Sequence, residues 1–215
     1  MLFSGIFPSR VLTTLGLPII GEGKPDIPEP GDKKWSKNAL PSMAYGYNLS
    51  LTPLQVLAFY NAVANDGMMM KPYLVSEIQL YGETIKKYVP TVVDRHIASK
   101  STIRKAKDLL LGVVEVGTAH KLKTDEYLFA GKTGTAQKDY RKIKEKTIVG
   151  GYQASFAGFF PAENPQYTCI VVINDPKENG FYGGDVAGPI FREISDKIYA
   201  TKYKLHQALN SKPKP

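Results

Sequence analysis

The sequence predicts a mixed α/β (α+β) fold in which an antiparallel sheet carries helices on both faces. Segments with helical periodicity alternate along the chain with strand candidates. The strand candidates come in pairs around turn residues, which is typical of antiparallel hairpins. In 168–173, Thr-Cys-Ile-Val-Val-Ile, the positions of both alternate faces are apolar apart from Thr168. A strand of this kind is expected where helices cover both sides of a sheet.

Composition places the chain among ordinary globular proteins. Of its 215 residues, 43% are hydrophobic and 22% are charged, which excludes a disordered tail, a collagen-like fibre and a coiled coil. No run reaches 18 consecutive apolar residues, so no transmembrane helix is expected, and the start lacks the basic region of a signal peptide. The single cysteine, Cys169, cannot form an internal disulfide and is expected in the core.

The balance of charge leaves two interpretations open. Basic residues exceed acidic ones by 28 − 20 = 8, which could serve solubility or attract nucleic acid, a cell-wall polymer or a membrane surface. The basic residues are spread along the chain without an aromatic RNA-binding signature or a zinc spacing, so nucleic acid is not expected as a partner. His96, His120 and His206 lie far apart, and neither a metal nor another cofactor is expected.

An arm and a helix are expected in the first part of the chain. Residues 1–44 are rich in proline and glycine and should be loop, with at most one short helix near 8–15. The clearest helix covers 52–66, because Thr52 and Gln55 can form a capping box with a proline at the first helical position. The run Asn-Asp-Gly supplies its end.

A hairpin and a second helix should follow. Segments 73–81 and 83–89 can pair around Gly82. The spacing of apolar residues predicts a helix over 99–116, closed by Gly117. Its two candidate N-caps are Ser99 and Ser101. Its exposed charges are expected to be Lys100, Arg104, Lys105 and Lys107.

The last third of the chain favours strands and one more helix. A strand is expected over 127–135, a polar and basic mobile loop over 137–151, and a hairpin of 152–160 with 167–174. The residues that recur every four positions and predict the final amphipathic helix are Val186, Ile190, Ile194 and Ile198. Residues 203–215 are polar and should be a tail or linker.

One short run carries candidate chemistry, namely Lys132-Thr133-Gly134-Thr135 on the predicted strand 127–135. Gly134 would let a ligand backbone approach, so an extended peptide could add to the strand edge. Lys132 supplies positive charge, the threonines supply hydroxyl donors, and a backbone N–H could face a developing oxyanion. On these residues alone, a site for a carboxylate-ended peptide and an ordinary surface strand end are equally good interpretations.

Several longer stretches carry a resemblance. They are 44–55 (containing G-Y-G and T-P-L-Q), 60–67, 113–119 (V-V-E-V-G-T-A), 130–137 (A-G-K-T-G-T-A-Q), 155–161, 174–176 and 183–189. Their content and order over roughly 15–200 resemble the class B, division-type penicillin-binding protein transpeptidases, whose motifs include K-T-G.

The family's S-x-x-K nucleophile motif and its S-x-N motif lie upstream of these stretches, and neither occurs here in the expected place. Ser211 and Lys214 fit the first motif by letters only, as Ser36 and Asn38 fit the second.

The resemblance implies part of the penicillin-binding transpeptidase fold, which is serine β-lactamase-like. Residues 1–202 would be the C-terminal part of a transpeptidase domain, with 1–44 as its loop-rich arm, 45–202 as helices and sheet, and 203–215 as a polar tail. The parent protein would be a peptidoglycan D,D-transpeptidase that cross-links D-Ala-D-Ala stem peptides in cell-wall synthesis and binds β-lactams such as penicillin. It would work at the extracytoplasmic (periplasmic) face of the bacterial cytoplasmic membrane, anchored by an upstream helix, with cell-division proteins as candidate partners.

The resemblance also assigns roles in the site. Lys132, Thr133, Gly134 and Thr135 would bind the substrate, and the Thr135 backbone N–H would be half of the oxyanion hole. Because the nucleophilic serine and its lysine are missing, this chain alone is expected to be inactive. The alternative is a non-enzymatic module that binds cell-wall peptide or a division partner; a piece of a class A β-lactamase shares K-T-G but lacks the T-P-L-Q helix. Without upstream strands, 167–174 would keep an unpaired edge, so self-association is expected.

Overall fold

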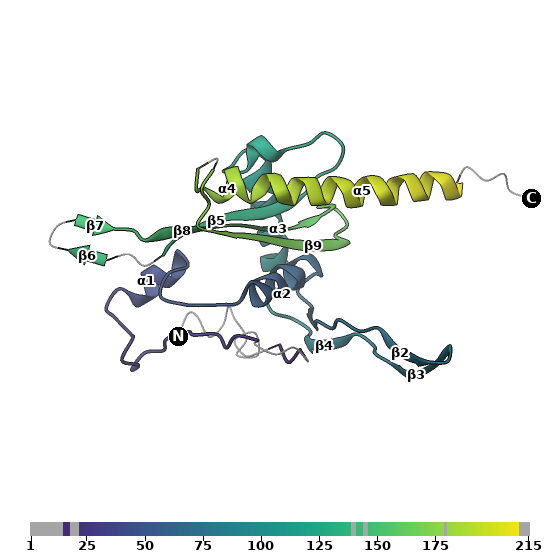
Figure 1. Cartoon of the computed structure of the whole chain (residues 1–215), viewed down its shortest axis with the longest axis horizontal. Helices are drawn as coiled ribbons and strands as arrows, with labels where there is room; N and C mark the ends of the chain where they lie inside the picture. The colour runs from purple at the N-terminus through teal and green to yellow at the C-terminus, as the bar shows by residue number, and fades with distance from the viewer. Residues whose placement is uncertain (1–14, 18–21, 139–140, 144–145, 179, 211–215) are drawn as a thin grey trace, which may run out of the picture. The chain divides into compact units, whose positions relative to one another are not determined.

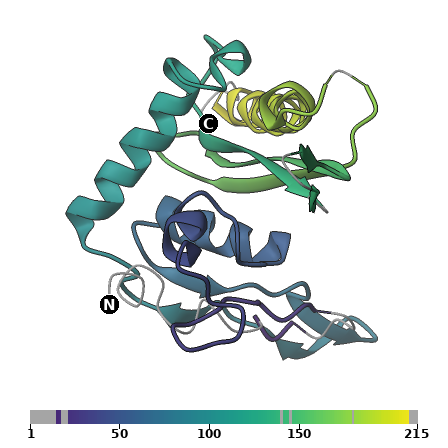
Figure 2. The ribbon, with the colours of Figure 1, turned by 90° about the vertical axis from the view of Figure 1, so that its left-hand side faces the viewer.

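One long helix connects two structural units in the computed structural model, which describes residues 15–17, 22–138, 141–143, 146–178 and 180–210. The N-terminal unit ends at Leu109 and the C-terminal unit begins at Leu110. The boundary falls inside helix α3 (Lys100–Glu115), which appears in Figure 2 as the long teal helix. Each unit has its own antiparallel strands, as predicted for a mixed α/β chain (Figure 1).

Short elements make up the N-terminal unit before α3. They are α1 (Ala39–Ala44), α2 (Pro53–Ala64), β1 (Met69–Lys71), β2 (Glu77–Leu80), β3 (Glu83–Lys87) and β4 (Thr91–Asp94). Strand β1 pairs with β4, and β2 pairs with β3, in two separate two-stranded sheets. The pair β1–β4 was not predicted, because strands of three and four residues are too short to show an alternating pattern.

Helix α2 begins with the predicted capping box. The Gln55 backbone N–H donates to Thr52 Oγ1 at 3.2 Å, and the Thr52 N–H donates to Gln55 Oε1 at 2.8 Å. The helix ends as predicted at Asn-Asp-Gly, where Gly67 has a φ of 89° and its N–H donates to the Ala62 carbonyl at 2.8 Å. Sequence reasoning therefore located both ends of this helix.

The predicted hairpin around Gly82 is confirmed, with shorter strands than expected. Tyr81 and Gly82 both have positive φ, 49° and 86°, as a tight two-residue hairpin turn requires. No residue of β2 or β3 is buried, and the hairpin projects from its unit in Figure 1.

The loop-rich arm contains one helix that was not predicted. Helix α1 occupies 39–44, at the end of the segment expected to be loop. Before it, the Asp26 and Ser50 backbones bond to each other in an isolated antiparallel bridge, with N–O distances of 2.9 and 2.8 Å. The short helix expected near 8–15 falls almost wholly outside the described residues.

The C-terminal unit consists of a three-stranded sheet, a projecting hairpin and helices. After the end of α3 its elements are η1 (His120–Leu122), β5 (Ala130–Lys138), β6 (Arg141–Ile143), β7 (Lys146–Ile148), β8 (Gly151–Phe160), β9 (Tyr167–Asn174), α4 (Gly183–Val186) and α5 (Gly188–Asn210). The sheet order is β5-β8-β9, all antiparallel, so the predicted hairpin of 152–160 with 167–174 is confirmed.

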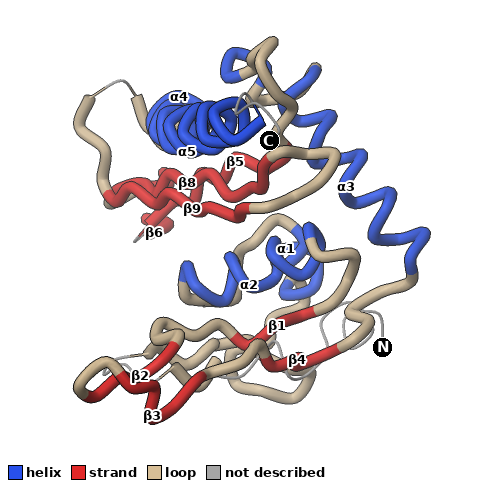
Figure 3. The backbone as a smooth tube through the Cα atoms, turned by 90° about the vertical axis from the view of Figure 1, so that its right-hand side faces the viewer, coloured by secondary structure: helices blue, strands red, loops and turns tan. Residues whose placement is uncertain are grey.

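Helices α4 and α5 lie over one face of this sheet (Figure 3). The core between them is aromatic: Phe129, Phe156, Phe160 and Phe191 are at most 1% exposed, and the Phe191 ring centroid lies 4.6 Å from that of Phe156. Val114, near the end of α3, packs into the same cluster. The core thus fixes β5 and β8 against α5.

The buried side of α5 differs from the one that the sequence predicts. Ile190 and Ile194 are 42% and 36% exposed, whereas Phe191 and Ser195 are fully buried. Residues spaced four apart do not stay on one face of a helix, because the helix has 3.6 residues per turn. The larger ring of Phe191 occupies the core instead. Ile198 alone keeps the predicted contact with the core of the unit.

The prediction of a loop over 137–151 was wrong. Strand β5 continues to Lys138, β6 and β7 pair as a hairpin, and β8 already begins at Gly151. The hairpin extends beyond the end of the three-stranded sheet in Figure 1. The many basic residues of this segment are more typical of a loop, and they obscured the strand signal.

Strand β9 lies at an edge of the sheet and is less buried than predicted. Every residue from Tyr167 to Ile173 is half-buried, because β9 pairs only with β8 among the described strands. Cys169 packs against the aromatic core but stays half-buried, and this partial burial raises the pKa of its thiol. Among the described residues, no helix combines the length and apolar character that crossing a bilayer requires.

Candidate functional site

The four candidate residues lie together on an open strand edge. Lys132, Thr133, Gly134 and Thr135 fall in the first two thirds of β5, which pairs with β8 on one side and with no other described strand. Lys132 is exposed and the other three are half-buried. The backbone of the run therefore faces an edge that a further strand could join.

Strand register divides the four residues between the two faces of β5. Thr133 lies opposite Phe156, whose ring is in the core, so both threonines belong to the face covered by α4 and α5. Lys132 and Gly134 belong to the other face, where Gly134 lies opposite Ser155. A Cβ on Gly134 would lie 2.4 Å from Ser155 Oγ, so glycine gives the neighbouring hydroxyl its space.

Lys132 and Thr133 form a small polar cluster with Thr118. The Lys132 ammonium donates to the Thr133 carbonyl at 2.9 Å and to Thr133 Oγ1 at 3.3 Å. Thr133 Oγ1 lies 3.0 Å from Thr118 Oγ1. Thr118 falls in the stretch 113–119 that carries the resemblance, but it was not predicted as a site residue. Its only sequence signal is a hydroxyl residue directly after the glycine that closes α3.

Thr135 bonds to the start of helix α4. The Gly183 N–H donates to Thr135 Oγ1 at 3.0 Å, so the hydroxyl is an acceptor in this contact and keeps its own proton for a ligand. A Cβ on Gly183 would lie 2.3 Å from the Ser155 carbonyl oxygen and 2.4 Å from that of Gly134. Only glycine permits this approach, and its role could not be predicted without the register of the strands.

Aromatic rings stack next to the start of helix α4. The rings of Tyr152 and Phe181 stack with centroids 4.0 Å apart, and Phe181 lies 4.5 Å from Tyr182, which is 58% exposed. Tyr182 directly precedes Gly183. The pattern Phe-Tyr-Gly-Gly is the only sequence signal for this feature, and it was not assigned to the site.

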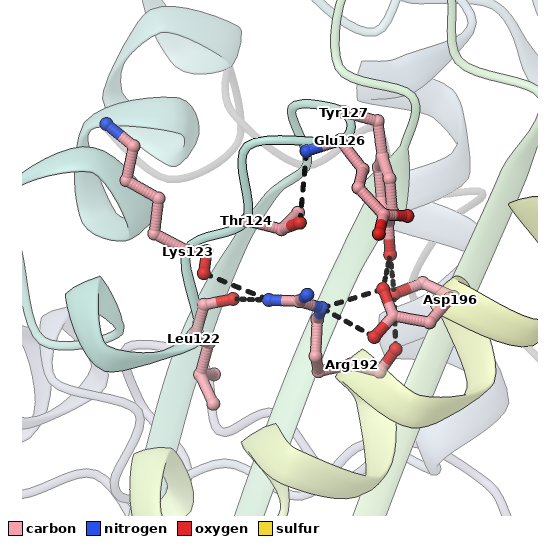
Figure 4. Close-up of polar contacts among 8 residues, drawn as sticks. Leu122, Lys123, Thr124, Glu126, Tyr127, Arg192 and Asp196 are labelled. Atoms are coloured by element: carbon pink, nitrogen blue, oxygen red, sulfur yellow. Dashed lines mark hydrogen bonds and ion pairs between the residues drawn. The ribbon is translucent and has the colours of Figure 1, made fainter.

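A partly buried polar network fixes the segment that leads into β5 (Figure 4). Arg192 on α5 donates to the Leu122 carbonyl at 2.6 Å and, through Nε, to both Asp196 oxygens at 2.7 and 2.8 Å. The Tyr127 hydroxyl donates to Asp196 Oδ1 at 2.7 Å and lies 2.6 Å from Ser195 Oγ. Helix α5 therefore sets the position of the chain just before the candidate strand.

The site can bind an anion but contains no paired base. Hydroxyls of Thr118, Thr133 and Thr135 and the exposed Lys132 ammonium surround an open strand edge. Among these described groups the only basic side chain is Lys132, and an ammonium that donates cannot accept a proton from a hydroxyl. No group of three or more His, Cys, Asp or Glu side chains among the described residues could hold a metal ion.

The structure places the chance motif letters only in part. Ser36 and Asn38 belong to the N-terminal unit, and Ser211 and Lys214 lie outside the described residues.

Comparison with known proteins identifies relatives over most of the chain. The sequence profile of the penicillin binding protein transpeptidase domain matches residues 16–196. The peptidoglycan D,D-transpeptidase FtsI of Buchnera aphidicola is 34% identical over 191 residues, which are 88% of this chain and 31% of that protein. The probable peptidoglycan D,D-transpeptidase PenA of Neisseria flavescens is 31% identical over 163 residues, 75% of this chain and 37% of that protein. Stage V sporulation protein D of Bacillus subtilis is 34% identical over 154 residues, 70% and 23% respectively.

Solved structures show the same fold. The TP domain of Burkholderia pseudomallei penicillin-binding protein 3 has a TM-score of 0.68 and 26% identity, covering 90% of this chain and 55% of that one. Mycobacterial penicillin-binding protein 3, solved with aztreonam, has a TM-score of 0.75 at 24% identity, covering 99% and 47%. The chain spans about a third of the length of the curated relatives it matches.

Proposed function

Because the chain belongs to the penicillin-binding protein transpeptidase family, we propose that β5 is the strand that binds the carboxylate end of a stem peptide in a peptidoglycan D,D-transpeptidase. The observation that carries the proposal is the open edge of β5 beside Lys132, with threonine hydroxyls on the same strand. A peptide that ends in D-Ala-D-Ala could extend the sheet at this edge, while its carboxylate meets the ammonium and the hydroxyl donors. β-Lactams carry a comparable carboxylate and would bind in the same way.

Each residue of the run has a separate role in this proposal. Lys132 attracts the carboxylate, and Thr133 and Thr135 donate hydroxyl protons to it. Gly134 keeps the strand surface open to the peptide backbone. The Thr135 backbone N–H supplies half of the oxyanion hole, where one donor typically contributes about 3 kcal/mol to transition-state stabilisation.

The chemistry in the intact protein would be serine-type acyl transfer. A serine forms an ester with the penultimate D-alanine, terminal D-alanine leaves, and an amine of a second stem peptide takes the acyl group. The chain described here lacks S-x-x-K and S-x-N in the family positions, so by itself it should bind without reacting. The alternative, a non-enzymatic module for cell-wall peptide or a division partner, makes the same prediction for the isolated chain.

Two measurements test the proposal on the 215-residue chain. In an NMR titration with N-acetyl-D-Ala-D-Ala, the amides of Gly134 and Thr135 should shift, and the same peptide with an amidated C-terminus should leave them in place. Lys132→Met should abolish the shifts, whereas Lys197→Met, at an exposed site on α5, should preserve them. Equal shifts with the acid and the amide would refute carboxylate recognition.

Fluorescent penicillin tests the absence of a nucleophile. We expect no covalent label on the chain after denaturation. Stoichiometric labelling that survives denaturation would mean that a reactive serine is present after all.

The proposal includes a setting for the protein. Peptidoglycan lies outside the cytoplasmic membrane, so the site would act at the extracytoplasmic (periplasmic) face, with the protein anchored by a helix outside this sequence and cell-division proteins as partners. Fractionation of cells that carry the tagged gene product would test this; recovery in the cytoplasmic fraction would contradict it.

We also propose that isolated copies of the chain associate through β9. Its outer edge has no partner among the described strands, and the strand is apolar from Cys169 to Ile173. Exposed apolar strand edges pair readily with one another.

A further inference from the structure

An ion pair joins the two outer strands of the C-terminal sheet. Lys138 is the last residue of β5, and Asp175 directly follows the last residue of β9. Lys138 Nζ lies 2.8 Å from Asp175 Oδ2, although β8 runs between the two strands. The pair therefore crosses over Gly151, the first residue of β8.

The surroundings of Asp175 distinguish this pair from an ordinary surface contact. A Cβ on Gly151 would lie 2.1 Å from Asp175 Oδ1, so the carboxylate rests directly against the strand backbone. Asp175 has a φ of 48°, in the left-handed region that aspartate adopts more readily than most residues, and its N–H donates to the Tyr152 carbonyl at 2.8 Å. The Lys138 hydrogen bond holds the pKa of Asp175 below its usual range. Most exposed ion pairs lack such constraints.

A chain of direct contacts connects the Lys138–Asp175 ion pair to Thr135. The Tyr152 backbone accepts the Asp175 N–H, and the Tyr152 ring stacks on Phe181 at 4.0 Å with an interplanar angle of 16°. Two residues later, the Gly183 N–H donates to Thr135 Oγ1 at 3.0 Å. Movement of Tyr152 would therefore shift the aromatic pair and, with it, the donor that bonds to Thr135.

The direction of that hydrogen bond matters for carboxylate binding. While Gly183 donates to Thr135 Oγ1, the hydroxyl proton points away from Gly183 and can be donated to an anion. If the hydrogen bond from the Gly183 N–H were lost, the Thr135 hydroxyl would be free to rotate and to donate its proton to a protein carbonyl instead. This step rests on the proposed function of Thr135.

We propose that Lys138 and Asp175 are positioning residues for the substrate site: their ion pair fixes the Tyr152–Phe181 stack, which places the Gly183 N–H on Thr135 and so orients the Thr135 hydroxyl. Neither residue contacts the substrate in this arrangement. Both lie outside the K-T-G run.

Amide hydrogen exchange in the 215-residue chain tests the positioning role. In Asp175→Asn, which keeps the shape of the side chain, we expect the Gly183 amide to exchange roughly fivefold faster, the effect of losing about one hydrogen bond. The Phe156 amide, in the middle of β8, should keep its rate. Lys138→Met should have the same selective effect, and the double variant should add nothing further, because the two residues act as a pair.

The matched control removes an ion pair elsewhere in the same unit. Glu193→Gln breaks the exposed Lys197–Glu193 pair, whose atoms lie 2.7 Å apart, and should leave Gly183 exchange unchanged. A Gly183 rate that is unchanged in both Asp175→Asn and Lys138→Met, or that rises only in proportion to Phe156, would overturn the proposal. In the second case the pair stabilises the whole unit and has no positioning role.

A ligand titration separates this inference from the proposed function. With N-acetyl-D-Ala-D-Ala, Asp175→Asn should raise the dissociation constant roughly fivefold. If the unsubstituted chain does not bind the peptide, the proposed function fails, and Gly183 exchange still decides the positioning role. If Asp175→Asn binds as tightly as the unsubstituted chain, the ion pair does not orient Thr135 for its ligand.

Discussion

Gly183 fixes how closely helix α4 approaches the K-T-G strand. A side chain at this position would overlap two backbone carbonyl oxygens, at 2.3 and 2.4 Å, and neither can rotate away. We expect Gly183→Ala to lower the free energy of unfolding by about 1–3 kcal/mol and to weaken carboxylate binding through Thr135.

Urea denaturation of Gly183→Ala measures this effect, and Gly112 provides the control. A Cβ on Gly112 would meet nothing within 4 Å in helix α3. Gly112→Ala should therefore stabilise the chain by up to about 1 kcal/mol. Equal stability of Gly183→Ala and the unsubstituted chain would show that α4 does not dock as described.

The Tyr127 hydroxyl connects the approach to β5 with helix α5. Tyr127 is 7% exposed and bonds to Asp196 and Ser195. Tyr127→Phe should cost about 1–2 kcal/mol of unfolding free energy. Tyr182→Phe, at an exposed tyrosine, should change the stability by less than about 0.5 kcal/mol.

The pH dependence of stability gives a second measurement on Tyr127. Burial raises the pKa of Tyr127, and the hydrogen bond to Asp196 adds to the effect. The folded state thus disfavours the phenolate, so this stabilisation is full below the ordinary tyrosine pKa of about 10 and is lost as the pH rises above it. Urea midpoints measured between pH 8 and 11 should fall less steeply for Tyr127→Phe; parallel curves would contradict this account.

At the residue level, the sequence indicated the candidate residues on β5 but not the residues that contact them. Lys132 and its neighbours were recognisable because the run combines a cation, hydroxyls and a glycine. Thr118 and Gly183 were not, because they reach β5 only through the fold, from positions 15 and 48 residues away in the sequence. Long-range contacts of single residues leave no local pattern.

Among the elements, the β2–β3 hairpin tests how a turn sets strand pairing. Tyr81 has a φ of 49°, which is costly for an aromatic residue, whereas asparagine adopts this conformation readily. We expect Tyr81→Asn to stabilise the hairpin by about 0.5–1 kcal/mol. Gly82→Ala, at a φ of 86°, should destabilise it by about 1–2 kcal/mol.

Amide exchange of the β2 and β3 residues measures both effects locally. If Tyr81→Asn exchanged faster than the unsubstituted chain, the turn would not have the left-handed conformation described for it.

Elements with strong end signals were predictable, and those shaped by neighbours were not. Helix α2 followed its capping box, and the β8–β9 hairpin followed its turn residues and the apolar run in 168–173. The face of α5 was misjudged because Ser195, a polar residue, is buried by its bond to Tyr127. The β6–β7 hairpin was missed because its basic residues suggested a loop.

For the whole molecule, the unpaired edge of the apolar strand β9 predicts association of the isolated chain. Sedimentation velocity over a range of concentrations should show dimers that dissociate on dilution. Ile170→Lys places a charge in β9 and should raise the dimer dissociation constant at least about tenfold, equivalent to 1.4 kcal/mol. Ile78→Lys is the control, because Ile78 is an exposed apolar residue on β2, outside the proposed interface, and its substitution should leave the dimer intact. A monomer at every concentration would contradict the prediction.

The order β5-β8-β9 leaves the two borders of the sheet unlike each other, one bearing the charges of Lys132 and Lys138 and the other aliphatic. If two copies pair through their β9 edges around a two-fold axis, their two three-stranded sheets form one continuous sheet. The association stops at the dimer, because neither copy then has a free β9 edge. The lysine-bearing borders would then point outward at opposite ends. Growth into a filament would require unlike borders to meet, and the β5 edges of both copies would stay accessible in the pair.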